Sequence, residues 1–201
     1  MTSVCAIVGA GEGLGAALAA RFARGGYDMA LISRSEAGSA DALAAAQAEG
    51  TSAKFFQGDA NEPESIEAAL IEAREIGQID VMIYNVRGGF PASEPLDMTY
   101  KAMEEVHRLE VVGAFAAAKA VLPDMRARGS GRILFSSATA AYRGSAGYPL
   151  YAIGKFGLRA LSQSLAKAYA NEGVHIVHVR LDCDLDVPIM RKLYGNAYDP
   201  A

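Results

Sequence analysis

The chain has 201 residues, of which 51% are hydrophobic, and its 19 basic and 23 acidic residues give a formal net charge of −4. This composition predicts a folded domain rather than a disordered chain. The lack of a basic tract argues against nucleic acid as a partner, and the lack of a long apolar run argues against a membrane-spanning protein.

The cysteines and the N-terminus predict where the protein works. Cys5 and Cys183 are the two cysteines, which suggests a reducing compartment and no disulfide framework. No basic segment precedes the first apolar stretch, so we expect no secretory signal. These features favour a cytoplasmic protein.

Short apolar runs with strand character alternate with Ala-rich helical stretches along the chain. The predicted strands are residues 4–8, 28–33, 52–57, 80–84, 131–137 and 174–181. The predicted helices are residues 14–24, 36–49, 62–76, 99–122 and 149–171. Such alternation implies right-handed crossovers and a sheet covered on both faces. We therefore predict an α/β fold with a doubly wound, mostly parallel sheet of six or more strands, in one domain over residues 1–201.

A glycine-rich turn joins the first predicted strand to the first helix. The turn contains Gly9, Gly11, Gly13 and Gly15, and glycine lets a backbone turn sharply and approach a ligand closely. The following helix N-terminus offers free N–H groups and a positive dipole end to a phosphate. Strand, turn and helix in this order are typical of a dinucleotide site, although such a turn could also serve only to pack the helix on the strand.

Tyr151 and Lys155 stand four residues apart at the start of a predicted helix, so their side chains share one face. A cationic lysine beside a phenol lowers the tyrosine pKa. A phenol tuned in this way can exchange protons with an alcohol or a carbonyl group.

With these motifs at its two ends, the chain resembles the short-chain dehydrogenase/reductase family over nearly its whole length. The family's Thr-Gly-x-x-x-Gly-x-Gly is similar to residues 8–15, with Val in place of Thr. The acidic residue that contacts the adenine is matched by Asp59. The family's Asn-Asn-Ala-Gly is matched by residues 84–87, which read Tyr-Asn-Val-Arg, and the Tyr-x-x-x-Lys motif is intact.

The resemblance implies a Rossmann-type three-layer sandwich that binds a nicotinamide dinucleotide. It implies that Lys155 holds the nicotinamide ribose and lowers the pKa of Tyr151, and that Tyr151 is the general acid/base. The predicted cofactor-binding residues are Gly9, Gly11, Gly13, Leu14, Gly15, Ser33, Arg34, Asp59, Ala60, Asn85, Tyr151 and Lys155.

Two positions of the predicted active site depart from the family pattern. Glu110 stands where a helix Asn that positions a proton-relay water is expected; it either holds a water itself or belongs to a site that no longer needs the relay. The catalytic serine position falls on Ala138, between Ser137 and Thr139, with Ser136 before them. We predict Ser137 as the active-site hydroxyl, because Ser136-Ser137 ends the strand as the family's Ser-Ser does. The alternative is that these hydroxyls only bond to the turn backbone.

Cofactor preference is predicted from the end of the second strand. An acid there would bind a ribose 2′-hydroxyl, but this chain has Ser33-Arg34, which suits a 2′-phosphate. We therefore expect NADP(H) rather than NAD(H). We expect no metal site, since the acids at 182, 184 and 186 alternate as in a solvated loop and the histidines at 175 and 178 point to opposite faces.

We expect a small-molecule carbonyl or alcohol substrate, with an aromatic lining from Phe90, Tyr142 and Tyr148. The Ala-rich helices resemble the family's oligomer interface and imply a homodimer or homotetramer. The chain ends soon after residues 188–194, where family members continue through a further helix and a seventh strand. The leading hypothesis is an oxidoreductase that transfers hydride; the alternative is a dinucleotide-binding sensor or partner subunit with little or no turnover. A methyltransferase would leave Tyr151 and Lys155 unexplained.

Overall fold

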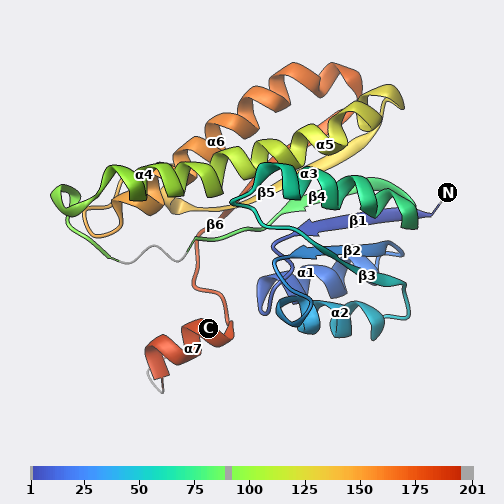
Figure 1. The fold of residues 1–201 in the computed structure, drawn as a ribbon, viewed down its shortest axis with the longest axis horizontal. Coiled ribbons are helices and arrows are strands. Elements are labelled where there is room, and N and C mark those ends of the chain that lie inside the picture. The colour runs from blue at the N-terminus through green and yellow to red at the C-terminus, as the bar shows by residue number, and fades with distance from the viewer. Residues whose placement is uncertain (1, 89–91, 196–201) are drawn as a thin grey trace.

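A six-stranded parallel sheet forms the centre of the computed structural model, which describes residues 2–88 and 92–195 (Figure 1). The strand order is β3-β2-β1-β4-β5-β6, and every pairing is parallel. The strands are β1 (Ser3–Val8), β2 (Asp28–Ser33), β3 (Ala53–Gln57), β4 (Gln78–Tyr84), β5 (Gly131–Ala138) and β6 (Val174–Leu181). The order reverses direction between β1 and β4, and in such sheets a ligand crevice forms at that point.

Seven α-helices occur among the described residues. They are α1 (Leu14–Ala23), α2 (Ala40–Gln47), α3 (Pro63–Glu72), α4 (Tyr100–His107), α5 (Gly113–Ala127), α6 (Pro149–Tyr169) and α7 (Pro188–Tyr194). Five of the connections between strands contain at least one of them, as parallel pairing requires. Short 3₁₀ turns precede α2 and follow α3 and α6.

The helices cover the sheet on both faces, with α1 and α2 on one side and α3, α5 and α6 on the other (Figure 1). Each face has its own apolar core. Cys5, Ile7 and Leu31 pack with α1 and α2, whereas Val4, Ala6 and other alternate residues of the strands pack towards α3 and α5. Strands that are buried on both faces read as continuous apolar runs. The predicted three-layer, doubly wound architecture is confirmed.

The predicted helix over residues 99–122 is wrong in two respects. Its middle is a π-turn (Arg108–Val112), in which the backbone hydrogen bonds span one residue more than in an α-helix. The helix also continues through Pro123 to Ala127. Leu122 and Met125 on either side of the proline are buried in the core, and this packing outweighs the missing N–H.

Close contact between two loops fixes the carboxyl edge of the sheet. Gly9 has a φ of 87°, in the left-handed region, and a Cβ there would lie 2.7 Å from the carbonyl oxygen of Asn85. Only glycine fits such a place without strain. The turn after β1 therefore lies directly against the loop after β4.

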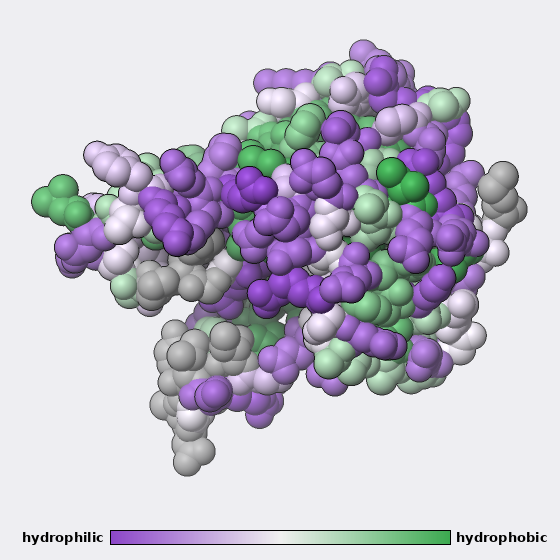
Figure 2. Space-filling model, viewed as in Figure 1, coloured by the Kyte–Doolittle hydropathy of each residue, from purple (hydrophilic) through white to green (hydrophobic). Residues whose placement is uncertain are grey.

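The C-terminal helix α7 stands apart from the main body and leaves a hollow between them (Figures 1 and 2). The face seen in Figure 2 is mostly hydrophilic, with hydrophobic residues in separate patches. No helix in the described part of the chain combines the length and the apolar character that crossing a membrane requires. Phe90 lies outside the described residues.

Candidate active site

A cavity of about 730 Å³ opens at the carboxyl ends of β1, β4, β5 and β6. This volume is typical of a small-molecule site. Seven of the predicted site residues lie on its wall: Gly9, Leu14, Gly15, Asn85, Ser137, Tyr151 and Lys155. The fold thus brings together the glycine-rich turn and the Tyr-x-x-x-Lys motif, which lie at opposite ends of the sequence.

The remaining predicted residues do not line this cavity. They are Gly11, Gly13, Ser33, Arg34, Asp59 and Ala60. Ser33 ends β2, and Asp59 follows β3, so both belong to the neighbouring strands of the same sheet edge. A ligand that reached them would extend from the cavity across the ends of β1 and β2.

The start of α1 fits a phosphate group. Gly13 caps the helix with a φ of 72° and no side-chain hydrogen bond, so the first N–H groups have no side-chain cap. A Cβ at Gly13 would lie 2.6 Å from Cγ1 of Val187. The glycine therefore also lets the segment before α7 approach the turn closely.

Asn85 ties the two sides of the sheet's reversal point together. Its side-chain amide donates to the carbonyl of Gly9 at 3.1 Å, and its backbone N–H donates to the carbonyl of Val8 at 2.8 Å. These bonds hold the loop after β4 in register with the glycine-rich turn. Asn85 thus joins the two loops, and it also lies on the cavity wall.

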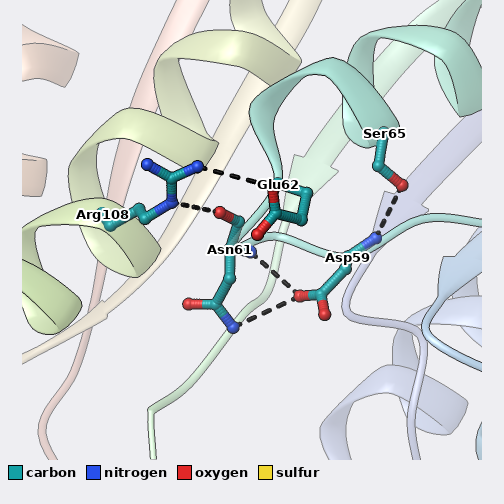
Figure 3. A network of polar contacts seen from close by, with 5 residues as sticks. All are labelled: Asp59, Asn61, Glu62, Ser65 and Arg108. Atoms are coloured by element: carbon teal, nitrogen blue, oxygen red, sulfur yellow. Dashed lines mark hydrogen bonds and ion pairs between the residues drawn. The ribbon is translucent and has the colours of Figure 1, made fainter.

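Ser33 and Asp59, at the ends of β2 and β3, already form hydrogen bonds within the protein. Ser33 donates to the carbonyl of Ser35 at 2.8 Å, and the Ser33 and Ser39 hydroxyls are 2.7 Å apart. Arg34 is exposed. One carboxylate oxygen of Asp59 accepts the backbone and side-chain N–H groups of Asn61 (Figure 3). Asp59 is therefore oriented by its own loop.

Two of the hydroxyl candidates at the end of β5 have different surroundings. Ser137 is 4% exposed, and its Oγ has no partner among the described residues. Thr139 instead donates to the Asp182 carboxylate. Since buried polar groups normally have a partner, the Ser137 hydroxyl on the cavity wall is available for a ligand.

Glu110 contacts Lys155 directly. Lys155 Nζ donates to Glu110 Oε2 at 2.8 Å, and it lies 3.5 Å from the carbonyl oxygen of Ser136. The side chains of Lys155 and Glu110 are 3% and 0% exposed. From the sequence, Glu110 either holds a water molecule or belongs to a site that no longer needs the relay. The structure shows neither alternative directly, because Glu110 forms an ion pair with Lys155.

The π-turn aims Glu110 at Lys155 and is held from outside. Tyr84 donates to the carbonyl of Leu109, inside the π-turn, at 2.5 Å. Arg108 at its start donates to the carbonyl of Asn61, and its guanidinium lies 3.4 Å from the Glu62 carboxylate (Figure 3). Both side chains therefore stabilise a backbone irregularity of the kind that frequently marks functional sites.

The predicted lowering of the Tyr151 pKa by Lys155 is wrong for the protein alone. Burial is the largest cause and raises the pKa of Tyr151 above its ordinary value of 10.0; Arg87 opposes this, and Glu110 adds to it. Lys155 Nζ lies 5.7 Å from the centre of the Tyr151 ring. Its ion pair with Glu110 offsets its charge. Nothing in the sequence indicated that contact except the unusual Glu at position 110.

Several cavity residues carry no role predicted from the sequence. Among them are Glu12, Arg87, Leu181, Val187, Pro188 and Met190. Arg87 stands two residues after Asn85 in the matched motif. Its positive charge could have marked it as a site residue from the sequence. The described residues contain no group of three His, Cys, Asp or Glu side chains that could hold a metal ion.

The sequence of residues 3–183 matches the short chain dehydrogenase family, and the chain belongs to that family. It is 33% identical to oxidoreductase UcpA of Escherichia coli, with 85% of this chain and 65% of that protein aligned. It is 31% identical to 3-dehydrosphinganine reductase TSC10B of Arabidopsis thaliana, with 90% of this chain and 55% of that protein aligned. The chain thus spans about half to two thirds of the length of these relatives.

Solved structures share the fold. The short-chain dehydrogenase of Rhodopseudomonas palustris has a TM-score of 0.83 and 28% identity, over 96% of this chain and 92% of that one. ElxO with NADP bound has a TM-score of 0.88 at 18% identity, over 96% and 78% of the two chains. An NADH-dependent reductase with NAD has a TM-score of 0.82 at 23% identity, over 90% and 78%. Solved proteins with this fold thus include one with NADP and one with NAD.

Replacing Tyr84 tests how the π-turn is held. Tyr84→Phe removes the bond to Leu109, so we expect the free energy of unfolding at pH 7 to fall by about 0.5–1.5 kcal/mol. Burial raises the pKa of Tyr84 well above 10.0, so its stabilising contribution is complete below pH 10 and is lost as the pH rises further. The variant should therefore lose less stability than the parent above pH 10 in urea titrations.

Tyr148→Phe is the matched control, because the Tyr148 side chain is exposed. Equal stability of the Tyr84 and Tyr148 variants at pH 7 would contradict the proposed support of the π-turn.

Proposed function

We propose that this chain is an NADP(H)-dependent oxidoreductase that transfers hydride between the cofactor and a carbonyl or alcohol carbon. The observation that supports this proposal is the convergence of Ser137, Tyr151 and Lys155 on one cavity wall with the glycine-rich turn. The uncapped start of α1 and the close backbone approach at Gly9 provide space and donors that suit a dinucleotide. When bound, the cofactor supplies the hydride acceptor or donor.

Each catalytic side chain has a distinct proposed task. Tyr151 gives a proton to the substrate oxygen during reduction and takes one back during oxidation. Ser137 orients that oxygen through its otherwise unpaired hydroxyl. Lys155 holds the nicotinamide ribose with an ammonium group whose three N–H bonds are only partly used by Glu110 and the Ser136 carbonyl.

The remaining proposed cofactor contacts extend along the sheet edge. Gly9, Gly11, Gly13, Leu14 and Gly15 approach the pyrophosphate, and Asn85 borders the nicotinamide side. Asp59 and Ala60 border the adenine. Ser33 and Arg34 meet the 2′-phosphate, for which the exposed guanidinium of Arg34 is suited.

We also propose a homo-oligomer in a reducing, cytoplasmic compartment. Phe115 on α5 and Ile153 and Phe156 on α6 are apolar side chains left exposed on the helices that cover one face of the sheet. Burial of such side chains against a second copy would be favourable. Cys5 and Cys183 are both free, as is usual in reducing surroundings.

Thermal unfolding with each cofactor tests the binding proposal. A ligand that binds only the folded state increases the free energy of unfolding, by about 2.7 kcal/mol at a concentration 100 times its Kd. The melting temperature rises as a result. We expect NADPH to give the larger shift, and Arg34→Ala to reduce the NADPH shift while leaving the NADH shift. Arg143→Ala, at another exposed arginine, is the control. Equal shifts with both cofactors in the parent would reject the NADP(H) preference.

Turnover of Tyr151→Phe tests the chemistry. With a panel of ketones, aldehydes and quinones we expect the rate to fall by about 10²–10⁴-fold, because the proton donor is removed, with the cofactor-induced thermal shift retained. Tyr100→Phe, at an exposed tyrosine away from the cavity, should stay near the parent rate. Turnover that survives in Tyr151→Phe would remove Tyr151 from its role, and a parent protein that binds cofactor without any turnover would support the sensor alternative.

A further inference from the structure

The Lys155–Glu110 ion pair is far more buried than the other ion pairs in the described part of the chain. The next most buried, Arg128–Asp80, leaves 19% of each side chain exposed. Glu110 Oε1 has no hydrogen-bond partner among the described residues, so the carboxylate's stabilisation comes chiefly from Lys155. Removing one partner of such a pair leaves a buried charge without compensation. Glu110 therefore fixes the position of the Lys155 ammonium group.

The backbone of α6 is shaped to admit Glu110. A Cβ at Gly154 would lie 2.8 Å from Cγ of Glu110 and 2.8 Å from Cγ2 of Val106, closer than atoms pack. Gly154 is the residue before Lys155, so its missing side chain lets the carboxylate reach the lysine. Two separate elements, the π-turn and α6, thus both contribute to the contact.

The pair changes which charge acts on Tyr151. An ammonium and a carboxylate 2.8 Å apart form a dipole whose field falls off faster than that of a single charge. Arg87 lies on the same cavity wall and forms no hydrogen bond or ion pair with another described residue. Its guanidinium acts to lower the pKa of Tyr151, which burial raises.

We propose that Glu110 is a positioning residue that holds Lys155 in a buried, nearly neutral pair, and that Arg87 supplies the positive charge that stabilises the Tyr151 phenolate. This inference rests on the proposed role of Tyr151 as acid/base. It assigns a task to Glu110 and Arg87, two charged residues that stand where the family has neutral ones.

Other charged groups around the cavity are accounted for. Asp182 accepts the Thr139 hydroxyl and lies 3.8 Å from the Arg180 guanidinium. His178 on β6 has a pKa lowered by burial, then by Arg159 and Lys155. Glu12, Cys183 and Asp184 complete the titratable groups on the wall. The charges found to act on Tyr151 itself are those of Arg87 and Glu110.

Titration of the Tyr151 phenol in the absence of cofactor and substrate tests this proposal. Carbon-13 NMR of labelled tyrosine, with each protein compared to its Tyr151→Phe counterpart, isolates this one phenol among the nine tyrosines. We expect Glu110→Gln to lower the Tyr151 midpoint by about one pH unit, since it leaves the full charge of Lys155 nearby. We expect Arg87→Gln to raise the midpoint, with Arg143→Gln as the exposed control.

The double variant Glu110→Gln/Lys155→Met removes both charges and leaves no unpaired buried ion, so it should fold and keep the parent midpoint. An unchanged midpoint in Glu110→Gln, or a double variant that shifts as far as the single one, would overturn the proposal. If Glu110→Gln does not fold, a double variant whose midpoint departs from the parent's, or an Arg87→Gln variant with an unchanged midpoint, overturns it instead. The titration measures no turnover. Failure of the proposed enzymatic function would therefore show in the turnover experiment and not in this one.

Discussion

The buried contact between Lys155 and Glu110 is the interaction on which the geometry of the site depends. It joins α6 to the π-turn between α4 and α5, and the lysine also reaches the carbonyl of Ser136 on β5. Burying two charges is costly and is offset only by close, well-oriented pairing. The protein provides that pairing through the missing side chain of Gly154 and the bond from Tyr84 to the π-turn. Breaking either support would move the lysine that is proposed to hold the cofactor.

The fold explains why distant residues meet at this place. Parallel strands bring all their carboxyl ends to one edge, and the reversal between β1 and β4 leaves room for a ligand there. The glycine-rich turn brings backbone close to that space, and β5 and α6 add Ser137 and Tyr151. A fold does not by itself determine a reaction, so the chemistry at this place depends on the few side chains around it.

Much of the sheet and its helices could be predicted from the sequence, because short apolar runs indicate buried strands and the Ala-rich stretches between them indicate helices. The bounds of β2 and β6 were predicted to the residue. The π-turn could not be predicted, since the bond that supports it, from Tyr84 to Leu109, joins residues 25 positions apart. The Lys155–Glu110 pair was missed for the same reason: the two residues are 45 positions apart, and only their helices' packing joins them. Glu110 was recognised as unusual, but its partner was not.

A high-resolution crystal structure of the protein with its nicotinamide cofactor would measure the Lys155 Nζ to Glu110 Oε2 distance directly. The buried pair predicts that this distance stays within hydrogen-bonding range, near the 2.8 Å of the protein alone, while the remaining N–H bonds of Lys155 reach the ribose. A lysine that leaves Glu110 on cofactor binding, with a water molecule between the two side chains, would contradict the central role given to this pair.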